Sequence, residues 1–363
     1  MAMPLEGNAI HSGGRRTVAV GVVVAATLFT AGLLWAKWLP YVAKAATAHR
    51  TRHWAGSSML AVGGVHAGDR PTWHAAATFF HAYVSSIWPA LVVALLISAS
   101  VQALLPPRWL PRALNRRGLI SSALAGGAAG MPSMMCTCCA APVAVTLRRN
   151  GITPAAAVAY WLGNPLLNPA VLVFLFFVAP WQWTLTRLVV GVATVLGVAA
   201  AVGLATRAPG TGPAPTRAIA AAGDGAGIGG PRGFVRALSW LALVLLPEYA
   251  VLVLLVGALR GWLLTLAQPA HHGLLWALLL VVVVAVAGTL MVIPTAGEIP
   301  ILQGLALLGA SSGTIGALLI TLPAVSVPGA AMIARSFGWR AVATATAAVT
   351  AAGLLGAAVL SVL

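Results

Sequence analysis

The sequence predicts an all-α, polytopic membrane protein with about seven to nine transmembrane helices, arranged as two inverted repeats with re-entrant or broken helices. The 363 residues are 60% hydrophobic and only 7% charged, whereas about a quarter of the residues in a soluble domain are charged. Several apolar stretches reach the ~18 residues that span a bilayer. Two others are interrupted by prolines and polar residues. This pattern excludes a disordered chain and an ordinary soluble domain.

The first part of the chain, residues 1–77, is expected to hold an N-terminal tail, a first transmembrane helix and an external loop. The helix covers the apolar run 17–40, which follows Arg15 and Arg16. This run is long for the apolar region of a cleaved signal peptide, which favours a retained helix. The other expected spans cover residues 78–105, 154–180, 183–206, 237–260, 314–335 and 339–362.

Two apolar stretches do not fit straight spans. Residues 119–147 are long for one crossing, and residues 273–310 are short for two. Because proline removes a backbone donor and breaks helices, we expect each stretch to enter and leave the membrane on one side, as a re-entrant hairpin. Broken backbone at that depth is tolerated only inside protein or beside a water-filled cavity. The prolines expected to break helices are Pro132, Pro142, Pro165, Pro169, Pro294, Pro300 and Pro323.

The chain contains an internal duplication. Residues 207–236 are rich in Gly, Pro and Arg, which predicts a flexible cytoplasmic linker between a first repeat, 78–206, and a second, 237–363. One offset of 158 residues aligns four prolines, where chance predicts roughly half a match. The aligned pairs are Pro89 with Pro247, Pro111 with Pro269, Pro142 with Pro300, and Pro165 with Pro323; Gly130 with Gly288 and Gly151 with Gly309 align as well.

The positions of Lys and Arg favour hairpins over crossings. If residues 119–147 crossed the membrane, the basic cluster before them and the linker would lie on opposite sides, against the positive-inside rule. With hairpins, each repeat has an odd number of spans, so the repeats are inverted, as in many secondary transporters. The basic residues then expected in the cytoplasm are Arg15, Arg16, Arg108, Arg112, Arg116, Arg117, Arg148, Arg149, Arg207, Arg217, Arg232, Arg236, Arg335 and Arg340; those expected outside are Lys37, Lys44, Arg50, Arg52, Arg70, Arg187 and Arg260.

All three cysteines lie in the first hairpin, at Cys136, Cys138 and Cys139, with Met135 beside them. Thiolates and thioethers are soft ligands that prefer thiophilic centres such as Cu(I) or Zn, and trivalent arsenic resembles these chemically. A regular helix would present two of the sulfurs on one face, whereas an unwound tip would present three. The alternative is that small polarizable residues only pack a close helix contact.

A redox function is a further alternative, because Cys136 and Cys139 have the C-x-x-C spacing of thiol–disulfide carriers. A carrier that passes a disulfide across the membrane is expected to supply a cysteine from each half. The second repeat contains none.

Two acidic residues fall in apolar segments and are candidates for proton coupling. Glu298 lies in the second hairpin and aligns with Ala140 beside the cysteines, and Glu248 follows Pro247. An acid inside the membrane is costly and is by default a functional candidate. The alternatives are that Glu298 caps the N-terminus of a half-helix and that Glu248 makes a structural hydrogen bond.

The span after the first hairpin contains two Asn-Pro steps, at Asn164 and Asn168. Each proline interrupts the hydrogen-bond ladder and leaves carbonyls and carboxamides free to face a cavity. Asn168 aligns with Ser326 in the second repeat. We expect both spans to be broken helices that line a path, the alternative being packing kinks.

The same region resembles the ArsP-type permeases, a bacterial family of predicted membrane permeases whose studied members export trivalent organoarsenicals such as methylarsenite. The family's Pro-x-Cys-Ser-Cys-Gly-x-x-Pro stretch is matched by residues 136–142, and its Ser-Pro-x-x-Asn-Pro segment by residues 164–169. Cys139 replaces the family's glycine, Thr137 its serine, and Met134 the proline before the first cysteine.

This resemblance implies a multi-pass permease of the bacterial inner membrane. It would bind a trivalent arsenical at Cys136, Cys138 and Cys139 and release it outside by a rocking motion of the repeats. The third thiol leaves open a preference for another soft metal or metalloid.

No enzyme is expected, because the chain has no Walker loop, no Rossmann glycine pattern and no hydrolase triad. No cofactor or resident metal is expected either. The expected partners are the lipid bilayer and a small thiophilic metalloid. The net charge of +16 indicates loops that face an anionic leaflet, not nucleic acid.

Overall fold

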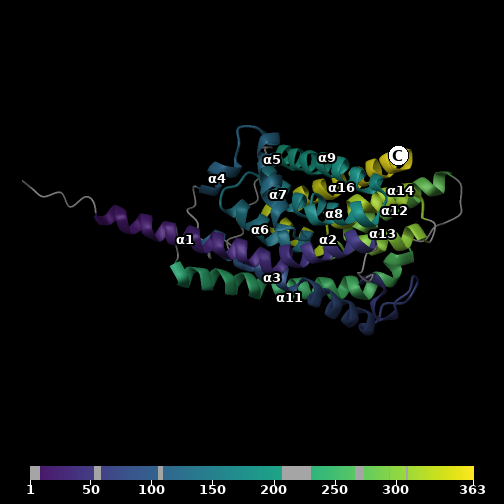
Figure 1. Ribbon diagram of the computed structural model, residues 1–363, viewed down its shortest axis with the longest axis horizontal. Coiled ribbons are helices and arrows are strands. Elements are labelled where there is room, and N and C mark those ends of the chain that lie inside the picture. Colours follow the sequence, from purple (N-terminus) through teal and green to yellow (C-terminus); the bar gives the residue numbers. More distant parts are fainter. Residues whose placement is uncertain are drawn as a thin grey trace, which may run out of the picture.

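The computed structural model describes residues 9–52, 59–104, 109–206, 230–265, 274–293, 295–307 and 310–363, and these contain helices and no β-strand. Most helices run along the long axis of the molecule (Figure 1). The helices are α1 (Ala9–Leu33), α2 (Leu39–Thr51), α3 (Trp73–Ala103), α4 (Trp109–Leu114), α5 (Leu119–Gly130), α6 (Thr137–Arg149), α7 (Pro154–Leu166), α8 (Pro169–Val178), α9 (Trp181–Ala205), α11 (Gly230–Thr265), α12 (Leu274–Leu290), α13 (Glu298–Leu307), α14 (Ser312–Ala324), α15 (Val327–Phe337) and α16 (Trp339–Val362).

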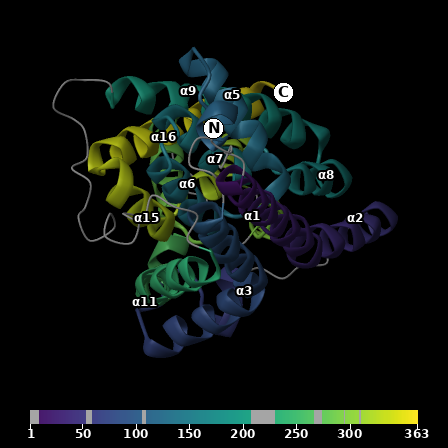
Figure 2. The same cartoon turned by 90° about the vertical axis from the view of Figure 1, so that its left-hand side faces the viewer.

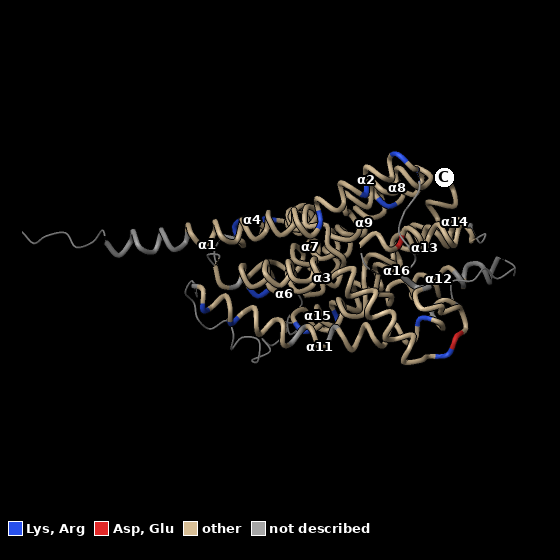
Figure 3. The backbone as a smooth tube through the Cα atoms, turned by 60° about the horizontal axis from the view of Figure 1, so that its bottom comes forward, with Lys and Arg blue, Asp and Glu red and all other residues tan. Residues whose placement is uncertain are grey.

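The described residues include five helical segments long and apolar enough to cross a membrane, or six if α14 and α15, bent by 52°, form one broken span. Shorter apolar helices lie at Ala250–Trp262 and Val281–Leu290. In Figure 3, long stretches of the helices carry no charged residue. Large apolar side chains such as Leu243 and Val251 are exposed, as expected where lipid covers the surface. The architecture is therefore that of a polytopic membrane protein.

The first interrupted stretch doubles back on itself. It consists of α5, a 3₁₀ turn at Met131–Ser133, and α6. The side chain of Asn115, before α5, donates to the carbonyl of Gly151 (2.8 Å) and accepts from the amide of Thr153 (2.8 Å), both just after α6. The stretch thus begins and ends at one place, as a re-entrant hairpin requires.

The prolines behave differently from one another. The expected break at Pro142 is wrong, because Pro142 lies inside α6, which continues to Arg149. The α3, α7 and α15 helices surround α6, so packing outweighs the one hydrogen bond that proline removes. Pro300 lies in the first turn of α13, where its missing donor costs little, so it also does not break the helix. Pro294 lies outside the described residues.

The other prolines sit at real interruptions. Pro132 lies in the 3₁₀ turn of the hairpin. Pro165 precedes the end of α7, and Pro169 begins α8 after the non-helical residues 167 and 168. Pro323 occupies the corresponding place near the end of α14.

The 158-residue offset relates whole helices as well as prolines. Shifted by 158, α7 coincides with α14, and α3, α8, α9 and α6 fall on α11, α15, α16 and α13 to within a few residues. The helices α3 and α11 lie side by side (Figure 2). Phe79 lies against Gly257 at one end of this pair, and Leu95 packs with Leu241 at the other. These two equivalent helices therefore run antiparallel, as inverted repeats require.

The expected linker, 207–236, lies outside the described residues as far as position 229. Its last part is helical, because α11 begins at Gly230. Phe234 and Ala237 pack in a cluster with Leu95 and Ala99 of α3, and this contact extends the helix beyond the expected boundary.

Three basic residues that were expected in external loops lie within helices and are buried, so their placement in loops is wrong. Lys37 lies in a π-helical segment, Leu34–Trp38, between α1 and α2. Arg187 lies in α9 and Arg260 in α11, and the side chains of both are 0% exposed. The guanidinium of Arg260 donates to the carbonyl of Val62 and lies over the ring of Phe79, which offsets the cost of burying it.

Candidate functional site

The three cysteine sulfurs converge at the tip of the first hairpin. Cys136 precedes α6 in an extended conformation, while Cys138 and Cys139 lie in its first turn. The Cys136 sulfur is 3.1 Å from each of the other two. All three cysteines are buried and form no disulfide, and their sulfurs lie within 4.8 Å of one another. Sulfurs bound at ~2.3 Å to one centre lie at most ~4.6 Å apart. The cluster can therefore offer two or three sulfurs to one thiophilic centre.

The loop that leads into the cysteines is held by Asn164. Its carboxamide oxygen accepts hydrogen bonds from the hydroxyl of Ser133 (2.5 Å) and the amide of Met135 (3.2 Å). Its nitrogen donates to the carbonyl of Tyr160 (2.9 Å). Between these contacts Met134 adopts a left-handed backbone, with φ of 49°, which turns the chain toward Cys136. Asn164 thus positions the sulfur cluster.

The N-terminus of α6 is also tied to the second repeat. The hydroxyl of Thr137 donates to the carbonyl of Pro323 (2.5 Å), at the break between α14 and α15. The carbonyl of Thr137 accepts from the indole of Trp161 (2.9 Å). The cysteines therefore lie where the first hairpin meets the broken span of the other repeat.

Lys37 brings a positive charge to the same place. Its ammonium donates to the hydroxyl of Thr295 (3.1 Å), in the second hairpin, and to that of Tyr41 (3.3 Å). It also lies close enough to Cys136 and Cys139 for electrostatic interaction. The π-helical segment around Lys37 is of a kind that often marks functional sites. The charge can offset the negative charge that the thiols acquire when they lose protons.

Glu298 lies at the start of α13, but its carboxylate is not free. It forms a buried ion pair of 2.8 Å with Arg187. Arg187 also donates to the carbonyls of Pro165 (2.8 Å) and Leu166 (3.2 Å), at the break between α7 and α8. Glu298 and Arg187 thus connect the second hairpin to the broken span of the first repeat. The side chain of Glu248, the other acidic candidate, lies outside the described residues.

Asn168 and Ser326 occupy equivalent positions at the two helix breaks. The oxygen of Asn168 caps α8 by accepting from the amides of Ala170 (3.0 Å) and Val171 (3.4 Å). Its nitrogen and the hydroxyl of Ser326 are buried and have no partner among the described residues. Such groups can bind a polar part of a substrate.

Lys37 and Arg187 were not expected at the site, because both were grouped with the external basic residues. The signal was available, since both lie within apolar runs, 17–40 and 183–206, and a charge inside such a run is costly unless it has a function or a partner. Their partners, Thr295 and Glu298, lie more than a hundred residues away, so only the folded chain reveals them.

Replacing Lys37 by methionine should slow thiol modification, because the thiolate is the reactive form and a nearby positive charge favours it. We expect N-ethylmaleimide to label the Lys37→Met variant at least about threefold more slowly than the wild type, as followed by mass spectrometry. Lys37→Arg should retain most of the rate. Lys44→Met, an exposed position one helix further on, is the matched control. Equal rates in all four proteins would contradict this role.

Comparisons with known proteins identify the family of this chain. Residues 72–209 match the family model described as "Predicted permease", of the ArsP type. The chain is 40% identical over 330 residues, 90% of each chain, to the UPF0718 protein YraQ of Escherichia coli (strain K12). No solved structure matches. The protein therefore belongs to the ArsP-type family of predicted membrane permeases.

Proposed function

We propose that this permease exports a thiophilic trivalent arsenical, which binds to Cys136, Cys138 and Cys139. The observation that carries the proposal is the convergence of three buried sulfurs within 4.8 Å. These sulfurs lie at a contact between the two repeats, which is where secondary transporters place their substrates.

The binding step is an exchange of oxygen for sulfur. A monosubstituted arsenic(III) centre carries two hydroxyl groups; two thiols replace them, two As–S bonds form, and two water molecules leave. No electron is transferred. Cys136 is the common member of the two close sulfur pairs, so we assign it to every bound state, with Cys138 or Cys139 as the second ligand.

Proton coupling is assigned to Glu298, through Arg187. Protonation of the carboxylate would leave the guanidinium without its counter-ion, and an unpaired buried charge is strongly destabilising. Arg187 would then redistribute its hydrogen bonds with Pro165 and Leu166, at the break in the first repeat. A proton on one repeat thereby changes a contact with the other, as a rocking mechanism needs. Glu248 remains a second candidate for this role.

Export in the bacterial inner membrane can be tested with everted vesicles. We expect vesicles that contain the wild type to accumulate methylarsenite, and each of Cys136→Ser, Cys138→Ser and Cys139→Ser to lower the initial rate. The loss should be greatest, about tenfold or more, for Cys136, because serine is a poor ligand for a soft centre. Ala351→Ser on α16, at an exposed position, adds a hydroxyl elsewhere and should leave the rate unchanged.

Two other outcomes of this experiment are informative. Accumulation of Zn²⁺ or Cu⁺ in place of the arsenical would identify a permease for another soft metal. A Cys136–Cys139 disulfide that forms and breaks during turnover would indicate a redox protein. Unchanged uptake in all three variants would contradict the proposed site.

Glu298→Gln should abolish the coupling of transport to the pH gradient without abolishing substrate binding. We expect uptake driven by a pH gradient to fall at least about tenfold, because glutamine cannot carry a proton, while binding of methylarsenite to the purified protein remains. Folding is controlled by the double variant Glu298→Gln, Arg187→Met, which removes the unpaired charge. A Glu298→Gln protein that still responds fully to the pH gradient would exclude Glu298 and direct attention to Glu248.

A further inference from the structure

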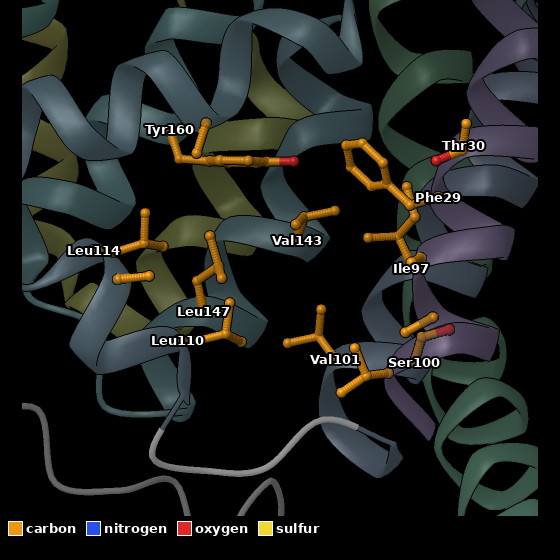
Figure 4. A pocket seen from close by; sticks show the side chains of 15 residues that line it. Phe29, Thr30, Ile97, Ser100, Val101, Leu110, Leu114, Val143, Leu147 and Tyr160 are labelled. Atoms are coloured by element: carbon orange, nitrogen blue, oxygen red, sulfur yellow. The ribbon is translucent and has the colours of Figure 1, made fainter. Parts of the chain in front are cut away.

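A cavity of about 420 Å³ lies beside the first hairpin, between α1, α3, α4, α6 and α7. Figure 4 shows Phe29 of α1 on one side and Leu147 of α6 on the other, with Val143 of α6 between them and the ring of Tyr160 extending toward Phe29. The side chains that line it include hydroxyls but no charged group. This volume is in the range of small-molecule sites, and a dry apolar cavity of roughly 150 Å³ already binds benzene.

Two helices connect this cavity to the cysteine cluster. On α6, Val143 is seven residues beyond Cys136, which corresponds to ~10 Å along the axis and to the same helix face. On α1, Phe29 is eight residues before Lys37, or ~12 Å. Because Lys37 is within electrostatic range of Cys136, both helices lead from the cavity wall toward the sulfurs within about three helical turns.

A chain of polar contacts also joins the cavity wall to the cysteine loop. The hydroxyl of Tyr160 lies 3.5 Å from that of Ser133. Ser133 donates to Asn164, which also binds the amide of Met135. A group bound against Tyr160 would therefore lie against the residues that position Cys136.

The cavity is formed by the first repeat together with α1, a helix that has no equivalent among the described residues of the second repeat. Its α1 wall precedes α3, the first helix that the 158-residue offset relates to the second repeat. An added helix thus encloses space beside the hairpin that carries the thiols, at the end of α6 where Arg148 and Arg149 lie. The sequence assigns this end to the cytoplasm.

We propose that this cavity is an intake subsite that holds the apolar substituent, alkyl or aryl, of the substrate before its thiophilic centre reaches the cysteines. This inference rests on the proposed function. A lipid acyl chain is apolar as well and fits the same space. The experiment therefore distinguishes the apolar substituent of the substrate from a lipid chain.

The test compares two substrates in everted vesicles, methylarsenite and phenylarsenite. Val143→Phe narrows the cavity, and Val189→Phe makes the same change at a position on α9 that is 54% exposed. We expect Val143→Phe to raise the KM for phenylarsenite by about tenfold and that for methylarsenite by less than about twofold, the size of discrimination that apolar pockets provide. Val189→Phe should change neither.

The opposing results are distinct. Equal changes in both KM values for Val143→Phe would indicate a lipid chain or a general structural effect, and would overturn the intake subsite while leaving the proposed function in place. Unchanged KM values in a well-folded Val143→Phe protein would overturn it as well. If the wild type transports neither arsenical, the proposed function fails, and this inference fails with it. Val143→Ala, which enlarges the cavity, should retain phenylarsenite transport.

Discussion

The constraint on which this structure depends is that broken helices in a membrane leave backbone carbonyls without water to bind. At each of the two breaks described above, a side chain donates hydrogen bonds to backbone carbonyls. Thr137 donates to the carbonyl of Pro323 at one break, and Arg187 donates to those of Pro165 and Leu166 at the other. Arg187 in turn needs Glu298, from the second hairpin, as its counter-ion. The side chains that bind these backbone carbonyls therefore also hold each hairpin against the other repeat.

This arrangement gives the two repeats different chemistry in similar places. The first hairpin carries the thiols at its helix N-terminus, while the second carries Glu298 there. Lys37, from a helix outside the duplicated part, contacts Thr295 of the second hairpin and lies near the thiols of the first. A change in the position of one repeat would alter hydrogen bonds and ion pairs at the site itself. The residues proposed for binding and for coupling are thus joined by a few short contacts.

Much of the architecture could be predicted from the sequence, because it depends on local patterns. Length and hydropathy located the spans, and the 158-residue offset, found from prolines, also relates the helices. The cysteine cluster was recognisable because its members are neighbours in the chain. Lys37 and Arg187 were misplaced, because a charge in an apolar run can be read as the end of a span unless its distant partner is known. Pro142 was misjudged because tertiary packing decides whether a proline interrupts a helix.

The central claim is that the cysteine sulfurs bind the substrate directly. Arsenic K-edge X-ray absorption of the purified permease, loaded with methylarsenite, tests it most directly, because the spectrum reports the atoms bound to arsenic. The account predicts two sulfur neighbours at ~2.3 Å, the length of a bond from thiolate to a soft centre, together with the methyl carbon. It also predicts loss of sulfur neighbours in Cys136→Ser. A bound arsenic that retains its oxygen neighbours and shows no sulfur would contradict the account.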